Sequence, residues 1–219
     1  MYKKKFSSLA ILIPSFNELH NLKKFIIKLN KNYRVLIIDD CSQDQTSEWL
    51  KKNGINFIKN KFNMGYEKSL IKGFKYLIKK KNIEKIITMD ADGQHNFKYI
   101  KNFLTSEKKY DSDLIVGARH KKNRYLEKII SNIFFKKFLL HDPLSGFKLY
   151  NSKKLKKIDL DNVKNLFLVD LLVSFIKQGY KVKCIFIKTK NRPDDPRVGG
   201  IVSVSFKMLL IFKYVLFNT

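Results

Sequence analysis

A pair of aspartates that follows a short apolar run constrains this chain more than any other feature. The run at residues 86–89 (IITM) is typical of a buried strand, and Asp90, Ala91, Asp92 and Gln94 come soon after it. In a continuing strand Asp90 and Asp92 would point to the same face. Two carboxylates at a strand end suit Mg²⁺ or Mn²⁺, which prefer oxygen ligands. An ordinary acidic turn uses the same residue types, so this stretch alone leaves both interpretations open.

The rest of the chain alternates strand-like apolar runs with helix-like periodic stretches. Strand-like runs lie at residues 9–13, 35–38, 56–59, 86–89 and 113–117. This alternation predicts one α/β domain, a three-layer α/β/α sandwich around a mainly parallel sheet. We also expect a helix over residues 166–178 and an alternating strand over 181–188, whereas residues 119–140 show no clear strand.

Polar and acidic residues follow several of the expected strands. The first strand runs into Pro14-Ser-Phe-Asn-Glu18 and the second into Asp39 and Asp40. Ligands of such sheets bind at the carboxyl ends of the strands, where these side chains and the pair at Asp90 and Asp92 would meet. Their convergence favours a site for a metal and a nucleotide over an ordinary turn.

The strong positive charge allows several kinds of partner. The chain has 45 Lys and Arg against 19 Asp and Glu, a formal net charge of +26. Such a balance suits nucleic acid or an anionic membrane surface, although a bias toward lysine codons would also give it. No recognition motif for nucleic acid is present, so we expect no nucleic-acid partner. The two cysteines have no metal or redox spacing and no signal peptide opens the chain, which predicts a cytoplasmic protein.

A series of short motifs runs through residues 9 to 200 in a fixed order. They are Ile13-Pro14-Ser-Phe-Asn-Glu18, Ile38-Asp39-Asp40-Cys-Ser42, Asn63-Met-Gly65-Tyr66, Met89-Asp90-Ala-Asp92-Gly-Gln94-His95, Gly117-Ala-Arg119, Asp142-Pro-Leu-Ser145-Gly146-Phe147-Lys148, Asp170 with Gly179-Tyr180, and Arg192 through Arg197-Val-Gly199-Gly200. The ordered set resembles the family 2 glycosyltransferases of the GT-A fold. Within that family it is most similar to the dolichyl- and polyprenyl-phosphate mannose or glucose synthases.

The resemblance implies an inverting, metal-dependent enzyme that moves a single sugar from a UDP- or GDP-sugar to a polyprenyl phosphate or a cell-surface glycan precursor. It implies a site for Mg²⁺ or Mn²⁺ at Asp90, Asp92 and Gln94. The donor-binding residues that it implies are Pro14, Phe16, Glu18, Asp39, Asp40, Gly65, Lys68, Asp90 and Ala91. The catalytic residues that it implies are Asp92, Arg119, Asp170, Arg192 and Arg197. A leaving nucleoside diphosphate bears about three negative charges, which a divalent cation and nearby arginines would stabilise.

Some positions depart from the resemblance. Relatives of the synthase branch usually carry Glu where Asp170 stands, a position that orients the acceptor or acts as a base. Pro196-Arg197 replaces the Ser-Lys of the closing loop, which weakens the assignment to that branch. The Gln-x-x-Arg-Trp motif of processive synthases is absent, so we expect transfer of one sugar at a time. A nucleotidyltransferase of related fold and a basic module that binds membrane or nucleic acid remain as alternatives.

The last segment of the chain allows two interpretations. We assign residues 1–200 to the catalytic domain and 201–219 to a C-terminal amphipathic helix. Val204, Met208, Ile211 and Val215 lie near one face of that helix, while lysines interrupt its apolar sequence. Such a helix either lies on a bilayer, in peripheral contact with the cytoplasmic face of a membrane, or packs on its own domain.

Overall fold

The structure is a computed structural model of the chain, and it describes residues 8–120, 124–163, 166, 168–190 and 201–218. The strands are β1 (Leu9–Ser15), β2 (Arg34–Asp39), β3 (Phe57–Lys59), β4 (Lys85–Thr88), β5 (Leu114–Arg119), β6 (Lys148–Asn151) and β7 (Val182–Ile187). The helices are α1 (Leu19–Asn32), α2 (Thr46–Lys52), α3 (Tyr66–Ile78), the 3-10 turn η1 (Phe97–Tyr99), α4 (Ile100–Tyr110), α5 (Tyr125–Phe138), α6 (Ser152–Leu155), α7 (Val169–Lys177) and α8 (Ile201–Asn218).

Within the described residues one sheet has seven strands, in the order β3-β2-β1-β4-β6-β5-β7. Strand β1 is parallel to β2 and β4, β2 is parallel to β3, and β5 is parallel to β7. Strand β6 is antiparallel to both of its neighbours, β4 and β5. The parallel strands therefore end at one edge of the sheet, and β6 begins at that same edge. The loops after β1, β2, β4 and β5 meet there with the loop that precedes β6.

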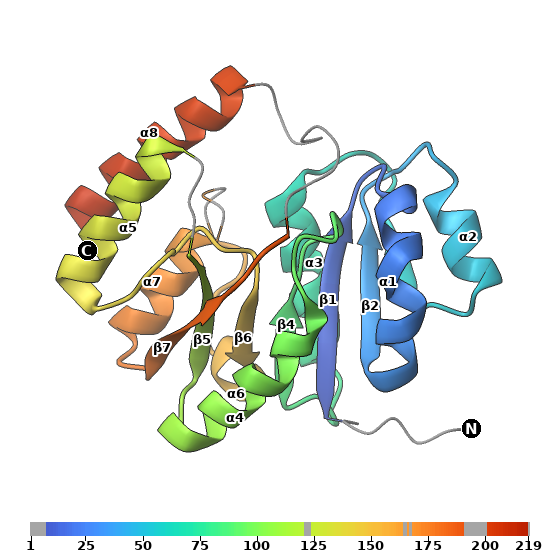
Figure 1. Cartoon of the computed structure of the whole chain (residues 1–219), viewed down its shortest axis with the longest axis horizontal. Helices are drawn as coiled ribbons and strands as arrows, with labels where there is room; N and C mark the ends of the chain where they lie inside the picture. Colours follow the sequence, from blue (N-terminus) through green and yellow to red (C-terminus); the bar gives the residue numbers. More distant parts are fainter. Residues whose placement is uncertain (1–7, 121–123, 164–165, 167, 191–200, 219) are drawn as a thin grey trace.

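The alternation of side chains along β1 divides the core into two layers. Leu9, Ile11 and Ile13 pack with residues of α1, α2 and α4, whereas Ala10 and Leu12 pack on the other face with α3 and the core that includes α5, α7 and α8. Successive residues of a strand face opposite sides, so a strand covered by helices on both sides must be apolar throughout. Figure 1 shows these helices on the two faces of the sheet. The predicted α/β/α sandwich with a mainly parallel sheet is confirmed.

The second half of the chain is more regular than its sequence indicates. Most of the stretch at 119–140, which shows no clear strand pattern, forms helix α5. The expected helix at 166–178 is the shorter α7, and the expected strand at 181–188 is β7. In Figure 1, α5 and α8 lie side by side at the end of the molecule away from α1 and α2.

Helix α8 packs one of its faces on the domain. Met208, Ile211 and Val215 are buried in the core that also contains α5 and α7. The ammonium of Lys207 lies 3.1 Å from the carboxylate of Glu67, which ties α8 to α3. Helix α8 therefore adds to the core of the domain through this face. No helix among the described residues is long and apolar enough to cross a membrane.

Candidate active site

A cavity of about 410 Å³ opens at the edge of the sheet where the parallel strands end. The first two strand ends supply part of its wall, and β4, β5 and the start of β6 supply most of the rest. The lining residues that the sequence already indicated are Pro14, Phe16, Glu18, Asp40, Gly65, Asp90, Ala91, Asp92 and Arg119. Those it did not assign include Tyr66, Glu127, Leu144, Ser145, Gly146, Lys148, Tyr150, Leu168 and Met208. The predicted convergence of strand-end residues is thus present in the fold.

The loops after β1 and β2 hold each other in place. The backbone N–H of Asn17 donates to Ser42 Oγ at 2.9 Å, and Asn17 Oδ1 accepts from the N–H of Gln43 at 2.8 Å. Asn17 has a φ of 54°, a left-handed conformation that asparagine tolerates better than most residues. The carboxylate of Asp44 accepts from the N–H of Leu19 at 2.9 Å and so caps α1 from the neighbouring loop. These contacts fix the loop that carries Phe16 and Glu18 at the cavity.

Asp40 organises a third loop on the same side of the cavity. Its Oδ1 accepts from the N–H of Met64 at 2.8 Å and from Asn60 Nδ2 at 2.7 Å. Its Oδ2 accepts from the N–H of Gly65 at 2.8 Å. A carboxylate offers about four acceptor positions. Asp40 is therefore occupied mainly by this loop and keeps little capacity for a ligand.

Asp90 follows β4 and is held by two aromatic side chains. The hydroxyl of Tyr66 donates to Asp90 Oδ1 at 2.9 Å, and burial together with this carboxylate raises the pKa of Tyr66, which keeps it a neutral donor. The N–H of Asp90 donates to Nδ1 of His95 at 3.2 Å, and Nε2 of His95 lies 3.7 Å from Asp90 Oδ2. His95 in turn stacks on Phe147 with 5.0 Å between ring centroids.

Gly146 brings the backbone before β6 against the carboxylate of Asp90. A Cβ at this position would lie 2.4 Å from Asp90 Oδ1, closer than any real contact allows. The hydroxyl of Thr88 donates to the carbonyl oxygen of Gly146 at 2.7 Å and so ties the end of β4 to this segment. A residue without a side chain is therefore needed here for the carboxylate to keep its place.

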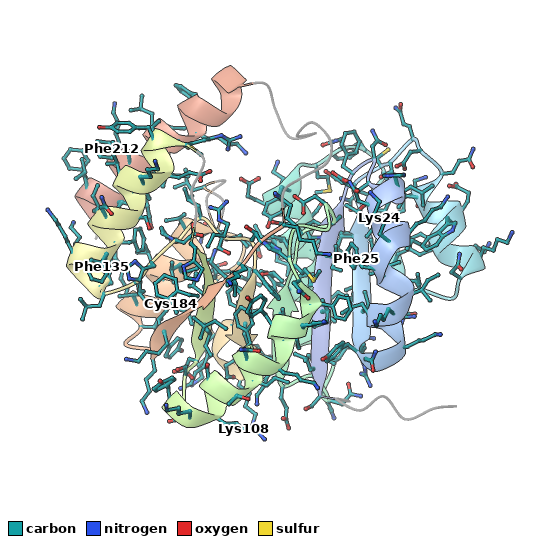
Figure 2. The ribbon with its side chains drawn as sticks, in the orientation of Figure 1. Lys24, Phe25, Lys108, Phe135, Cys184 and Phe212 are labelled. Atoms are coloured by element: carbon teal, nitrogen blue, oxygen red, sulfur yellow. The ribbon has the colours of Figure 1, made fainter. Side chains whose placement is uncertain are left out.

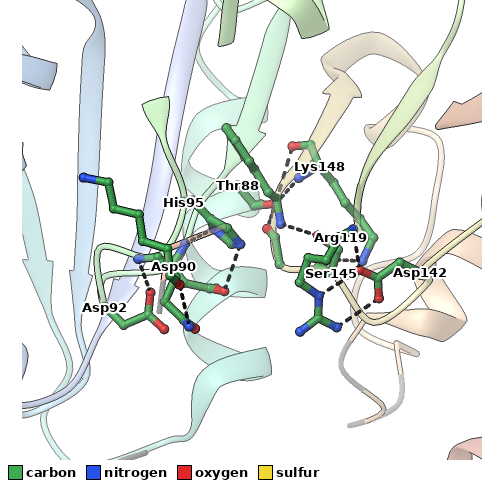
Figure 3. Close-up of polar contacts among 12 residues, drawn as sticks. Thr88, Asp90, Asp92, His95, Arg119, Asp142, Ser145 and Lys148 are labelled. Atoms are coloured by element: carbon green, nitrogen blue, oxygen red, sulfur yellow. Dashed lines mark hydrogen bonds and ion pairs between the residues drawn. The ribbon is translucent and has the colours of Figure 1, made fainter. Parts of the chain in front are cut away.

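Arg119, at the end of β5, is paired within the protein. Its Nε donates to Asp142 Oδ2 at 2.8 Å and its Nη2 to Oδ1 at 2.9 Å, a bidentate arrangement, and Glu127 lies 3.5 Å from Nη2. Burial lowers the pKa of Arg119, but the hydrogen bonds and charge of Asp142 outweigh it and raise the pKa overall. Figure 3 shows Arg119 and Asp142 in one group with Ser145 and Lys148, and Asp90, Asp92 and His95 in another.

The residues around Asp90 fit a hard divalent cation with few protein ligands. Asp90 and Asp92 both line the cavity, and Asp92 Oδ1 accepts from the N–H of Gln94 at 2.9 Å. In the described part of the chain no group of three or more His, Cys, Asp and Glu side chains could hold a metal. Mg²⁺ commonly binds through one or two carboxylates, with the phosphates of a substrate and water as its other ligands. The two carboxylates at the cavity suit that mode.

Comparison with known proteins places this site in a family. The model of the family described as Glycosyl transferase family 2 matches residues 10–172, which include Asp90, Asp92 and Arg119. The chain belongs to glycosyl transferase family 2. It is 30% identical to an uncharacterised protein of Methanocaldococcus jannaschii, over 94% of this chain and 90% of that protein.

Two further comparisons place this family 2 glycosyltransferase beside proteins of named activity. Dolichol-phosphate mannosyltransferase of Pyrococcus furiosus is 26% identical over 75% of this chain, which spans 52% of that protein's length. The chain also superposes on a crystal structure of glucosyl-3-phosphoglycerate synthase from Mycobacterium tuberculosis, with a TM-score of 0.72 at 10% identity. The superposition covers 96% of this chain and 78% of the synthase, which was solved with Mn²⁺, UDP and phosphoglyceric acid. The second likeness shows the shared fold and confirms the predicted GT-A type. The family favours the enzyme over the nucleotidyltransferase and the basic binding module.

Several residues predicted for the glycosyltransferase site lie away from the cavity wall. Asp39 is buried, and its carboxylate accepts from the N–H of Ser42 and the hydroxyl of Ser47, so it supports the loop rather than facing the cavity. Lys68 is exposed on α3 and is not a lining residue. Gln94 donates its side-chain amide to the carbonyl oxygen of Lys190 at 3.2 Å. Their roles in donor and metal binding stay predictions.

The three remaining catalytic predictions concern the C-terminal part of the glycosyltransferase. Asp170 lies in the first turn of α7, is buried, and accepts from the N–H of Leu171 at 2.9 Å. It does not line the cavity, whereas Tyr150 does, and burial together with the charge of Asp170 raises the pKa of Tyr150. Arg192 and Arg197 lie outside the described residues.

Sequence reasoning did not assign four residues that build the glycosyltransferase site. Tyr66, Asp142, Gly146 and Lys148 all stand in motifs that carry the family resemblance, yet none of those motifs gives them a role. The glycine in this turn was the one available signal, because glycine is used where a backbone approaches another group closely. For the other three, only the fold shows that Tyr66 and Lys148 line the cavity and that Asp142 is buried beside Arg119.

Proposed function

We propose that this family 2 glycosyltransferase moves a single sugar, with inversion, from a UDP- or GDP-sugar to an acceptor phosphate. One observation carries the proposal: Asp90, Asp92 and Arg119 line the same cavity as the loops at 14–18 and 63–65. The acids and the arginine would serve the charged diphosphate, and the two loops would hold the nucleoside. Sites that catalyse such transfers work mainly by stabilising the charge that develops on the leaving group.

Asp90 and Asp92 are the proposed ligands of Mg²⁺ or Mn²⁺. The crystal structure of the glucosyl-3-phosphoglycerate synthase contains Mn²⁺ and UDP, which supports a metal in an enzyme of this fold. When bound, the cation would offset the negative charge of the departing diphosphate. Tyr66 and His95 would keep the Asp90 carboxylate aimed at it through the contacts described above.

The proposed acceptor is a phosphate on a polyprenyl lipid. The lining of the cavity also includes three apolar residues from α8 and from the segments before β6 and α7, namely Met208, Leu144 and Leu168. The relationship to dolichol-phosphate mannosyltransferase supports a lipid phosphate, while the phosphoglyceric acid in the solved synthase supports a phosphorylated acceptor more generally. A hydroxyl of a cell-surface glycan precursor is the alternative acceptor.

An acceptor phosphate would attack the anomeric carbon of the donor sugar directly. The bond from that carbon to the diphosphate breaks, its electron pair leaves with the nucleoside diphosphate, and the configuration inverts. A phosphate is already ionised near neutral pH, so the step needs no general base, whereas a hydroxyl acceptor would need one. This agrees with Asp170, the predicted base, lying away from the cavity wall.

A lipid acceptor also implies contact with a membrane surface. The faces of α5 and α8 that point away from the core expose Phe135, Leu139, Phe206 and Phe217. Figure 2 labels Phe135 and Phe212 on this side of the molecule. We propose that the protein is cytoplasmic and binds peripherally to the cytoplasmic face of a membrane through this surface.

Thermal unfolding with nucleotide-sugars and a transfer assay test the proposal together. We expect UDP- or GDP-sugars to raise the Tm in the presence of Mn²⁺, and Asp90→Asn with Asp92→Asn to abolish that rise. Transfer of labelled sugar to farnesyl phosphate, compared with glycan acceptors that lack phosphate, identifies the acceptor class. A chain that binds vesicles or nucleic acid but responds to no nucleotide-sugar would contradict the proposal.

A further inference from the structure

Lys148 is a buried lysine at the wall of the cavity. It is the first residue of β6, its side chain is 1% exposed, and it lines the cavity with Ser145 and Gly146. Its ammonium donates to the carbonyl oxygen of Ser145 at 2.7 Å. An ammonium has three N–H donors, and in the described part of the chain this is the one hydrogen bond that the ammonium makes. Buried polar groups are normally paired, so the other donors point to a ligand.

The other cations of the cavity wall are already paired with carboxylates. Of the described lining residues, Arg119, Arg124 and Lys148 carry positive charge. Arg119 is held by Asp142, and Arg124 lies 3.6 Å from Glu127. No carboxylate of a described residue lies within ion-pair distance of the Lys148 ammonium. A buried charge is costly unless it has a partner, so an anion that enters the cavity would gain most at this residue.

The position of Lys148 favours a role on the acceptor side of the cavity. The donor loops reach the cavity from β1 and β2 and bring acids, Glu18 and Asp40, whereas β6 enters from the opposite half of the sheet. Tyr150 lies two residues further along β6 and therefore on the same face, and it lines the cavity together with Leu168, just before α7, and Met208 of α8. The backbone at Gly146, between Ser145 and Lys148, lies so close to Asp90 that a Cβ there would overlap its carboxylate. Lys148 thus stands between the proposed metal site and these apolar residues.

We propose that the ammonium of Lys148 binds a phosphate oxygen of the acceptor and holds it for attack on the donor sugar. The assignment rests on the proposed function, because it assumes a phosphorylated acceptor in the same cavity. The phosphate can belong to a polyprenyl lipid or to a small phosphorylated metabolite, because the ammonium would bind a phosphate oxygen of either one. The assay below therefore uses farnesyl phosphate and 3-phosphoglycerate as separate acceptors.

The test compares Lys148→Met with Lys153→Met, the same substitution at an exposed lysine on α6. We expect Lys148→Met to raise the acceptor KM by about tenfold to a hundredfold, the usual effect of losing a charge-assisted hydrogen bond, and to leave the donor KM nearly unchanged. Lys153→Met should change neither. Lys148→Arg, which keeps the charge, should recover part of the acceptor affinity. The response of the wild type to each acceptor shows which source of phosphate the site takes.

Two controls separate this proposal from folding and from the proposed function. Calorimetry measures the Mn²⁺-dependent binding of UDP or GDP by Lys148→Met. Binding like that of the wild type shows that the site is folded and that the donor side is intact. If the wild type binds donor and transfers sugar to a phosphate acceptor while Lys148→Met keeps the wild-type acceptor KM, the role of Lys148 is refuted and the proposed function stands. A rise in the donor KM alone would place Lys148 on the donor diphosphate and would also refute the acceptor assignment. If the wild type binds no nucleotide, the proposed function itself fails.

Discussion

The carboxylate of Asp90 takes its position from its neighbours more than from the strand that precedes it. Tyr66 donates to one oxygen, His95 lies beside the other, and Gly146 leaves the space that both oxygens fill. These residues come from α3, from the turn after β4 and from the loop before β6. The sequence motif therefore predicts Asp90 as a ligand, while its own turn and two segments distant in the sequence set the orientation of its carboxylate.

Replacing Gly146 by alanine tests whether that orientation matters. The new Cβ would meet Asp90 Oδ1 at 2.4 Å, and the carboxylate, as the end of a flexible side chain, would rotate away. We expect Gly146→Ala to lower kcat/KM about a hundredfold, because displacements of about 1 Å at a reacting site cost that much. The Tm should fall little. Steady-state kinetics and thermal unfolding measure the two effects, and wild-type kcat/KM in a folded variant would contradict the idea.

The buried ammonium of Lys148 should give the enzyme a pH dependence of its own. Its pKa is lowered to about 8, because burial, together with the charge of Arg119, lowers the pKa more than the charges of Asp142 and Asp90 raise it. The cation is therefore present below about pH 8 and is lost as the pH rises through that value. We expect kcat/KM for a phosphate acceptor to fall above pH 8 in the wild type, because kcat/KM reports groups of the free enzyme. In Lys148→Arg the profile should stay flat to higher pH, and identical profiles would contradict the assignment.

At the scale of elements, the sequence predicts some of the architecture well and misses the rest for physical reasons. Strands β1, β2 and β4 are apolar runs that are followed by polar or acidic residues, so the sequence could predict both that they are strands and that they end at one edge of the sheet. Helix α5 could not be predicted, because it has apolar residues on its buried face, such as Phe134, and on its exposed face, such as Phe135. Its helical period is blurred as a result. The burial of Lys148 could not be predicted either, because a lysine that alternates with apolar residues is normally expected to be exposed.

The contact between α3 and α8 offers a test at this scale. Lys207 lies 3.1 Å from the buried carboxylate of Glu67, and its neighbour Met208 lines the cavity. We expect Lys207→Met to lower the free energy of unfolding by about 1–2 kcal/mol, less than a fully buried pair would give because the lysine is partly exposed. Lys213→Met, at an exposed position of the same helix, is the matched control and should have little effect. Urea denaturation measures both, and equal stabilities would show that this ion pair does not fix α8.

At the scale of the whole molecule, a strong net positive charge accompanies exposed apolar residues on α5 and α8. The net charge of +26 would draw the protein to anionic lipid, and the outward residues of α5 and α8 supply apolar contact. On α5, Lys136 and Lys137 are exposed close to Phe135, so both features occur on one helix. Removing residues 201–219 is not a clean test, since it would also remove Met208, Ile211 and Val215 from the core.

Substitution of the exposed residues alone avoids that difficulty. Phe206 and Phe217 are 61% and 83% exposed, so replacing both by serine should leave the core intact. Burying one phenylalanine is worth about 1.5–3 kcal/mol, and we therefore expect Phe206→Ser with Phe217→Ser to lower binding to vesicles that contain phosphatidylglycerol by at least about tenfold. Tyr76→Ser with Tyr110→Ser, at exposed aromatic residues of α3 and α4, is the control and should float with the vesicles like the wild type. Equal flotation of all three proteins would contradict this prediction and would mean that charge alone, or another face, makes the contact. Raising the salt concentration would then separate these two explanations, because salt screens charge and leaves apolar contact in place.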